Sequence, residues 1–248
     1  MGVLEHAGYD VEVPQGHVCC GRPLYDYGFL DMAKQYLERI FDLLTPYDEK
    51  GIPIVVLEPS CWSALRDEIH GLFPERKETR QIMQNTFLLP EFLVEKAKYH
   101  PPRMNREAVM HGHCHHKAMI KGAEHEEKLL EQMQMKVSVL SDGCCGMAGS
   151  FGFESEHYDV SAKVGERALL PHVRQAGMNE IVIADGFSCR EHSSEDFGAH
   201  GHFDNRSHSR SYQLWADLHR GTLAIGVGIA AGVLGSVIFA SRNGNGNR

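Results

Sequence analysis

The residues best suited to chemistry are cysteines in a repeated arrangement. Two Cys-Cys-Gly triplets, Cys19-Cys20-Gly21 and Cys144-Cys145-Gly146, are each followed by a lone Ser-Cys, at Ser60-Cys61 and Ser188-Cys189. Cys114 completes the seven cysteines of the chain. Adjacent thiols on one tight turn are good metal ligands but poor disulfide partners, because closing a vicinal pair strains the disulfide. The pattern therefore indicates a bound metal or cluster.

The two halves of the chain offer different numbers of thiols. The second half supplies Cys114, Cys144, Cys145 and Cys189. The first half supplies Cys19, Cys20 and Cys61. Four soft thiolates suit an iron–sulfur cluster or tetrahedral zinc. Zinc sites usually take cysteines from Cys-x-x-Cys pairs, which this sequence lacks, whereas the spacing of cluster ligands varies more. We therefore expect a cluster in the second half, with zinc as the alternative.

Histidines flank these cysteines. Four of them surround Cys114, namely His111, His113, His115 and His116. A histidine at a strand end most often orients a ligand through a hydrogen bond instead of binding the metal. We therefore expect His113 and His115 to support the site. His192, which follows Cys189, is the first candidate for an extra ligand.

Three charged residues also lie close to cysteines in the sequence. Arg22 either offsets the charge of bound thiolates or is solvated at the start of a helix. Helix capping or turn formation accounts for Glu58 and Asp185, the acids at two predicted strand ends. No residue of the chain is assigned a catalytic role.

Strands and helices must bring the cysteines together. Strands are predicted over 54–57, 108–110, 137–140 and 180–184. Helices are predicted over 29–44, 62–72, 80–98, 118–133 and 154–170. This alternation predicts an α/β fold with mainly parallel sheets. The second-half cysteines then fall just beyond the carboxyl ends of strands, where open α/β sheets place their ligands.

The repeated flanks indicate an internal duplication with a period of about 125 residues, which suits two tandem domains. The expected organisation is a first domain over 1–100, a second over 107–192, a flexible linker over 193–218 and an apolar helix over 221–241. Pro101-Pro102 marks the boundary between the domains. The counterpart of Cys114 would precede Met1, so we expect the first domain to be incomplete at its N-terminus. A missing strand would leave a sheet edge open unless another segment covers it.

Composition and charge limit the class of protein. The chain has 248 residues, 42% of them hydrophobic, and a formal net charge of −8. This charge argues against general nucleic-acid binding, which needs a basic face. No N-terminal signal peptide is visible, and clustered cysteines in odd number suit a reducing compartment. We therefore expect a cytoplasmic protein.

The run over 221–241 qualifies this expectation. It contains no charged residue and matches the length of a membrane-spanning helix of about 20 residues. Gly228 and Gly232 have the spacing that lets membrane helices approach closely. The run predicts a membrane anchor; a buried or aggregation-prone tail is the alternative.

Several motifs resemble one family of cysteine-rich domains. These motifs occupy residues 17–28, 57–61, 111–118, 144–152 and 184–191. They resemble the CCG domain family and, more narrowly, the C-terminal iron–sulfur portion of FAD-linked oxidases and dehydrogenases of the glycolate and D-lactate type. The same domain occurs in the iron–sulfur subunit of glycolate oxidase and in one of the subunits of heterodisulfide reductase. The resemblance covers roughly residues 1–192.

This resemblance implies two tandem α/β domains that relay electrons. The electrons would come from FAD on a separate domain or partner chain and pass to an acceptor such as quinone. The cofactor that we expect in the second domain is a [4Fe–4S] cluster. The fullest form of the motif ends in Cys-x-x-Cys, whereas here Ala64 and His192 stand at the final positions. The alternatives are a heterodisulfide or thiol reductase acting at the cluster, and a structural zinc-binding scaffold.

Overall fold

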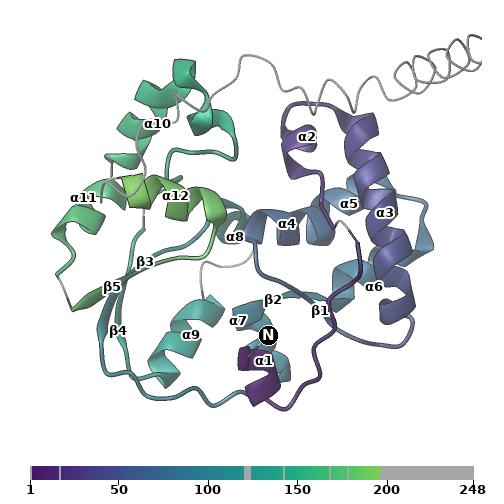
Figure 1. Ribbon diagram of the computed structural model, residues 1–248, viewed down its shortest axis with the longest axis horizontal. Helices are drawn as coiled ribbons and strands as arrows, with labels where there is room; N and C mark the ends of the chain where they lie inside the picture. Colours follow the sequence, from purple (N-terminus) through teal and green to yellow (C-terminus); the bar gives the residue numbers. More distant parts are fainter. Residues whose placement is uncertain are drawn as a thin grey trace, which may run out of the picture. The chain divides into compact units, whose positions relative to one another are not determined.

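The computed structural model describes residues 2–195 apart from residues 17, 120–123, 142, 168 and 178. The predicted apolar helix over 221–241 and the predicted linker beyond residue 195 lie outside these residues. Figure 1 shows the first half in purple and blue and the second half in teal and green. Among the described residues, no helix is both long and apolar enough to cross a membrane.

The first half combines helices with a two-stranded sheet. Its helices are α1 (Gly2–His6), α2 (Arg22–Asp26), α3 (Leu30–Asp48), α4 (Pro59–Ser63), α5 (Ile69–Leu72), α6 (Lys77–Asn85) and α7 (Leu89–Glu91), with π-helical turns η1 (Ala64–Glu68) and η2 (Phe92–Lys96). Strands β1 (Ile54–Val56) and β2 (Thr86–Leu88) pair in parallel, with Val55 opposite Phe87. Helix α3 buries Leu37, Ile40 and Phe41 on one face, as its amphipathic pattern predicts.

The single helix predicted over 80–98 is wrong. Helix α6 ends at Asn85, and residues 86–88 form β2, whose side chains are all buried. A new helix, α7, then begins, because Pro90 lacks an N–H donor and fits only a first helical turn. Strand β2 covers one edge of β1, whereas residues 11–13 form neither helix nor strand.

The second half contains a three-stranded parallel sheet. Its strands are β3 (Glu107–His111), β4 (Lys136–Val139) and β5 (Glu180–Ala184), in the order β4-β3-β5. Its helices are α8 (Cys114–Met119), α9 (Glu124–Gln132), α10 (Tyr158–Gly165), α11 (Leu169–Gln175) and α12 (Phe187–Glu195), with 3-10 turns η3 (Phe151–Phe153) and η4 (Ser155–His157). The predicted α/β class with parallel sheets is confirmed. The helix predicted over 154–170 is instead divided into η4, α10 and the start of α11.

Each half has an apolar core that includes cysteine. Cys20 packs with Leu37 and Phe41 in the first core. Cys145 and Cys189 belong to the second core, whose other members are Val109, Leu140, Met147, Leu169 and Val173. Part of each group of thiols is therefore enclosed by aliphatic and aromatic side chains.

Candidate metal centre

The second-half cysteines lie at one edge of the sheet β4-β3-β5. Cys114 begins α8 just after β3, and Cys189 lies in the first turn of α12 after β5. Cys144 and Cys145 lie in the loop that follows β4. Because the three strands are parallel, their carboxyl ends meet at the same edge. Three loops therefore converge as the strand pattern predicts.

The four thiols form a continuous chain of contacts. The thiol of Cys114 interacts with that of Cys144, and the thiol of Cys145 interacts with those of both Cys144 and Cys189. Cys145 and Cys189 are buried, whereas Cys114 and Cys144 are half-buried. All seven cysteines of the chain are free. The second half thus brings four sulfur donors together without a disulfide.

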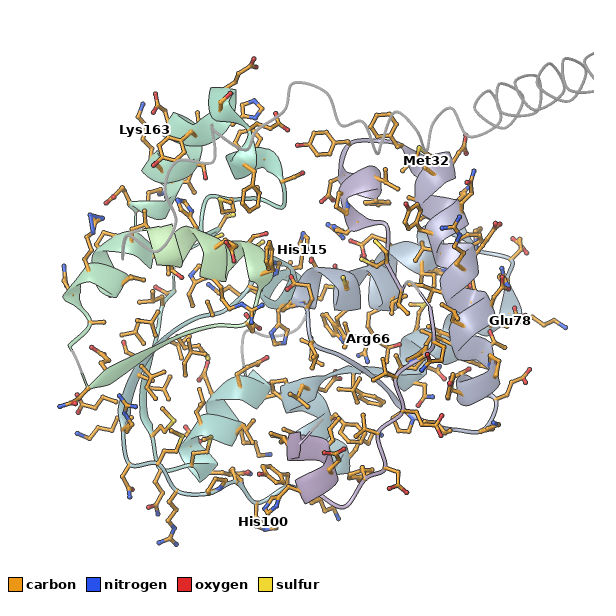
Figure 2. All side chains as sticks on the ribbon, viewed as in Figure 1. Met32, Arg66, Glu78, His100, His115 and Lys163 are labelled. Carbon is orange, nitrogen blue, oxygen red and sulfur yellow. The ribbon has the colours of Figure 1, made fainter. Side chains whose placement is uncertain are left out.

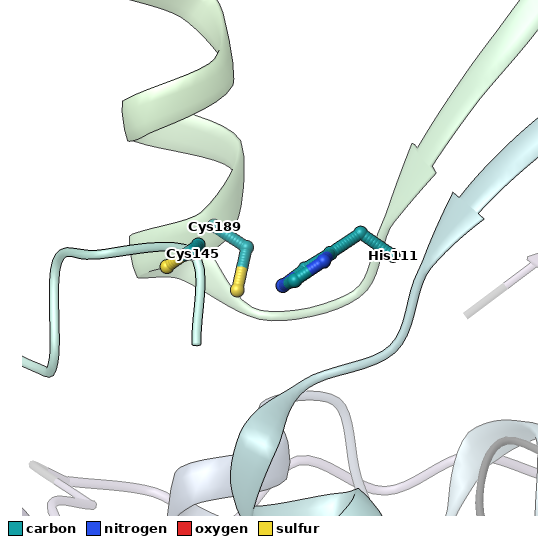
Figure 3. Close-up of side chains that lie close together, drawn as sticks. All are labelled: His111, Cys145 and Cys189. Atoms are coloured by element: carbon teal, nitrogen blue, oxygen red, sulfur yellow. The ribbon is translucent and has the colours of Figure 1, made fainter. Parts of the chain in front are cut away.

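His111 joins this group, although the sequence did not single it out as a site residue. It is the last residue of β3, and its ring interacts with the Cys189 thiol. Figure 3 shows the Cys189 sulfur between the Cys145 sulfur and the His111 ring, and one ligand atom of each lies within 4.8 Å of the others. Hydrogen bonds from Cys145 and then His111 lower the pKa of Cys189 to about 7, against the effect of burial. Its position at a strand end was the signal that could have identified it.

Backbone N–H groups also point at the sulfurs. The N–H of Gly146 donates to Cys144 Sγ over 3.3 Å, and the N–H of Ala148 donates to the same sulfur. Hydrogen bonds from Cys114 and Cys145, together with these amides, hold the pKa of Cys144 far below its usual range. The thiolate is the form that binds metal. The loop after β4 is therefore built to stabilise negative charge on sulfur.

Glycines let the loops approach closely. Gly146 has a φ of +109°, and a Cβ there would lie 2.2 Å from the carbonyl oxygen of Ser161 in α10. A Cβ on Gly186 would lie 2.1 Å from Cδ2 of His113. Side chains at either position would push apart the segments that carry the cysteines.

The first-half cysteines form a smaller group. Cys20 Sγ lies 3.0 Å from Sγ of Cys61, which is in α4. Their hydrogen bond raises the pKa of Cys61 and lowers that of Cys20. The backbone N–H groups of Gly21 and Arg22 donate to Cys19 and Cys20 respectively. The amide donors thus repeat those of the second half, but the described residues of this half contribute three thiols instead of four.

Arg22 connects the two halves. Its guanidinium donates to His115 Nε2 over 2.9 Å and to Ser63 Oγ over 3.2 Å, and it forms ion pairs with Asp26 and Glu68. Only 13% of its side chain is exposed, so the interpretation of Arg22 as a solvated residue is wrong. Burial, followed by the charge of Arg22, lowers the pKa of His115, which therefore accepts this hydrogen bond as a neutral ring. Figure 2 shows His115 near the place where α8 meets α4.

Glu58 forms a second connection. Its carboxylate accepts hydrogen bonds from Ser60 Oγ over 2.9 Å and from the N–H of Phe187 over 2.8 Å. Phe187 is the first residue of α12, so the Glu58 side chain accepts a hydrogen bond from an N-terminal amide of a helix in the second half. It makes no such bond with α4, the helix that follows Glu58 in the first half. His113 Nε2 lies 4.0 Å from the same carboxylate. The capping role predicted for Glu58 thus joins the halves beside both groups of thiols.

The remaining predicted histidines pack behind the loops. His113 is 5% exposed, and burial lowers its pKa to about 4. Its Nδ1 accepts the backbone N–H of His115 over 3.3 Å. His192 is 3% exposed and packs against Gly146 and Gly165. Both rings therefore support the backbone that carries the cysteines.

The donor set of the second half fits a thiolate-bound metal centre. Its sulfurs come from three loops, and amide N–H groups point at them. Proteins hold iron–sulfur clusters through cysteine thiolates and tune them through such hydrogen bonds. Four thiolates also suit tetrahedral zinc. The geometry thus supports metal binding by the residues that the sequence predicts.

Comparison with known proteins decides the family. The profile of the cysteine-rich domain CCG matches residues 1–66 and 108–190, and these two ranges contain all the cysteines. The chain belongs to the CCG family. The resemblance carried by the sequence motifs is therefore confirmed, and the two matched ranges are its two CCG regions.

The relatives of this CCG protein include two named groups. It is 29% identical over 195 residues to a subunit of the anaerobic glycerol-3-phosphate dehydrogenase of Escherichia coli K12, and the match covers 76% of this chain and 48% of that protein. It is 27% identical over 195 residues to lactate utilization protein A of Bacillus velezensis, covering 75% and 78%. The Bacillus subtilis protein of the same name is 24% identical over 194 residues, covering 74% and 77%. The chain spans about half the length of the glycerol-3-phosphate dehydrogenase subunits that it matches.

Proposed function

We propose that this chain is the iron–sulfur electron-transfer module of an FAD-linked dehydrogenase for a 2-hydroxy acid of the glycolate or D-lactate type. The observation that carries the proposal is the continuous group of thiols at the carboxyl edge of a parallel sheet, formed by Cys114, Cys144, Cys145 and Cys189. Four cysteine thiolates are the ligands of a [4Fe–4S] cluster. We expect one such cluster, in the second CCG region.

The surrounding residues suit a centre that changes charge. A bound cluster supplies reversible one-electron transfer. Amides of Gly146 and Ala148 donate to Cys144. The Arg22 guanidinium binds His115 in α8, and its charge is offset by ion pairs with Asp26 and Glu68. Hydrogen bonds to the sulfurs favour the more negative, reduced state of a cluster. The two amides would therefore raise its reduction potential.

Exposure suggests where electrons enter and leave. Cys145 and Cys189 are enclosed by the core of the second half, whereas Cys114 and Cys144 are half-buried. Electron exchange with a partner favours the more accessible side of a centre. We therefore assign the face beside Cys114 and Cys144 to contact with the partner.

The relatives support a flavin-containing partner. One is named as a subunit of a glycerol-3-phosphate dehydrogenase, and the others are named for lactate utilization. Glycerol-3-phosphate and lactate both carry a secondary alcohol, whose oxidation to a ketone releases two electrons and two protons. FAD can take both electrons at once, and a cluster can then remove them one at a time. The partner is accordingly an FAD-linked domain or subunit, with a quinone as the final acceptor.

The cellular location also belongs to this proposal. We place the module in the cytoplasm, with the run over 221–241 as an anchor that would bring it near a membrane quinone. This anchor rests on the sequence pattern alone.

Redox mixing tests the proposal directly. The full chain, purified anaerobically, is mixed first with photoreduced FAD and then with the quinone menadione, while its visible absorption is recorded. We expect the cluster band to bleach and then recover, and the band to be missing in Cys144→Ala. A coloured protein that responds to neither reagent would contradict the relay. Release of thiols from an added disulfide would instead favour the heterodisulfide reductase alternative.

A further inference from the structure

A second group of potential metal ligands lies apart from the thiols. It consists of His116 in α8, Glu126 in α9 and Asp185, which follows β5. His116 Nδ1 lies 3.2 Å from Glu126 Oε1 and 3.9 Å from Asp185 Oδ2. One ligand atom of each residue lies within 4.8 Å of the other two. Three segments therefore bring one nitrogen and two carboxylates to a single point.

His116 and Glu126 are buried, Asp185 is half-buried, and several of their polar atoms are unsatisfied. His116 is 1% exposed and Glu126 is 7% exposed. Within the described part of the chain, both ring nitrogens of His116, both carboxylate oxygens of Glu126 and Oδ1 of Asp185 lack a hydrogen-bond partner. Buried polar atoms are normally paired, and a buried carboxylate is costly unless a positive charge compensates it. A cation would take one ligand atom from each of the three residues.

Trp62 packs against this group, and the nearby guanidinium of Arg66 is paired with another carboxylate. The Trp62 ring packs edge-on against the His116 ring, with centroids 5.6 Å apart. Arg66 lies over the Trp62 ring, and its guanidinium forms an ion pair with Glu91 over 3.5 Å. Burial favours the neutral form of an imidazole, which leaves a nitrogen lone pair for a metal. Burial raises the pKa of Glu126 to about 8 and also raises that of Asp185, so a bound cation would restore the charged form of both carboxylates.

We propose that His116, Glu126 and Asp185 bind a Zn²⁺ ion at a site separate from the cysteine centre. Zinc binds histidine nitrogen and carboxylate oxygen at about 2.0–2.2 Å, so neighbouring ligand atoms lie about 3.4 Å apart in a tetrahedral site. The observed separations of 3.2 and 3.9 Å from the His116 nitrogen lie on either side of this value. Water would complete the fourth position, as in zinc sites with three protein ligands.

The ion would brace the loops of the cysteine centre. His116 and Cys114 share α8, and Asp185 lies in the segment that leads to Cys189 in α12. Glu126 adds α9, which contributes no cysteine. One ion would therefore tie two of the thiol-bearing segments to a third element of the fold.

Metal content tests the site in the full chain. The protein is purified anaerobically, treated with EDTA and dialysed against Zn²⁺, and zinc, iron and sulfide per chain are measured. Glu126→Gln keeps the side-chain shape but removes the charge, and Glu131→Gln changes an exposed residue of the same helix. We expect the wild type and Glu131→Gln to bind one more zinc ion per chain than Glu126→Gln, with equal iron and sulfide in all three proteins.

Thermal unfolding gives a second readout. Zn²⁺ at about a hundredfold excess over its Kd should raise the Tm of the wild type by about 5–10 °C and leave Glu126→Gln unchanged. In EDTA, Glu126→Gln should unfold near the wild-type Tm, because burial already favours the neutral form of Glu126 when no cation is bound. Asp185→Asn should behave like Glu126→Gln. Equal zinc content or equal Tm gains in the wild type and Glu126→Gln would overturn the proposal.

Discussion

The two groups of thiols are arranged alike, but they differ in the residue that follows one strand of each sheet. In the second half, the central strand β3 pairs with β5 and leads directly to Cys114, which supplies the leading thiol. In the first half, β2 pairs with β1 in the same parallel sense, yet it leads to Leu89-Pro90. A strand can thus complete the sheet without completing the ligand set. The number of ligands follows from the residue that the neighbouring strand delivers to the sheet edge.

The two Cys-Cys-Gly turns also differ in how closely they are packed. A Cβ on Gly146 would lie 2.2 Å from a backbone oxygen of α10, whereas a Cβ on Gly21 would lie 3.2 Å from the Cβ of Tyr36. Both glycines have positive φ. The second-half turn is therefore the more constrained of the two, as expected for loops that must hold four ligands at fixed positions.

Removing one thiol of the complete set should have the largest effect. Cys144→Ala deletes the sulfur that interacts with the thiols of Cys114 and Cys145 and with two backbone amides. A four-thiolate centre has no spare ligand, so we expect the visible absorption and the electron paramagnetic resonance signal of the reduced cluster to disappear. A variant that keeps the wild-type spectrum would show that the cluster lies elsewhere.

The two turn glycines should differ in their effect on stability. Gly146→Ala should lower the free energy of unfolding by more than about 3 kcal/mol, because the new Cβ meets backbone at a positive φ. Gly21→Ala should cost about 1–2 kcal/mol, mainly from its φ of +71°. Urea unfolding of the metal-free proteins measures both values. Equal losses would mean that the two turns are equally constrained.

Removing the contact that Arg22 makes between the halves should have an intermediate effect on stability. Arg22→Gln removes the guanidinium that pairs with Glu68 and donates to His115, so we expect a loss of about 2 kcal/mol. Arg39→Gln is the matched control, because Arg39 is exposed and should change stability by less than about 0.5 kcal/mol. Urea unfolding would reveal any difference, and equal values for the two variants would argue against a structural role for Arg22.

The smallest effect on the cluster is expected in the first half. Cys61→Ala removes one of three thiols from a group that does not complete a four-thiolate set. Iron and sulfide per chain should match the wild type, and stability should fall by about 1 kcal/mol, because Cys61 packs partly against the first core. Loss of iron equal to that of Cys144→Ala would instead show that the two groups hold metal jointly.

The local pattern of aliphatic residues in the sequence predicted the strands that place the cysteines, but it did not predict the contacts between the halves. Aliphatic runs identified β1, β3, β4 and β5 to within about a residue, and the strand ends then placed the second-half thiols. Strand β2 was missed, because three residues inside a helical pattern become a strand only by pairing with β1. The contact of Arg22 with His115 was equally inaccessible, since it joins residues far apart in sequence.

Metal analysis of the wild-type chain tests the central claim most directly. The protein is purified anaerobically, and iron, acid-labile sulfide and zinc per chain are measured beside the visible spectrum. A [4Fe–4S] cluster on the second-half thiols predicts about four irons with matching sulfide and a broad visible band. Zinc at the cysteines without sulfide or colour would contradict an electron-transfer module and identify the chain as a structural zinc-binding scaffold.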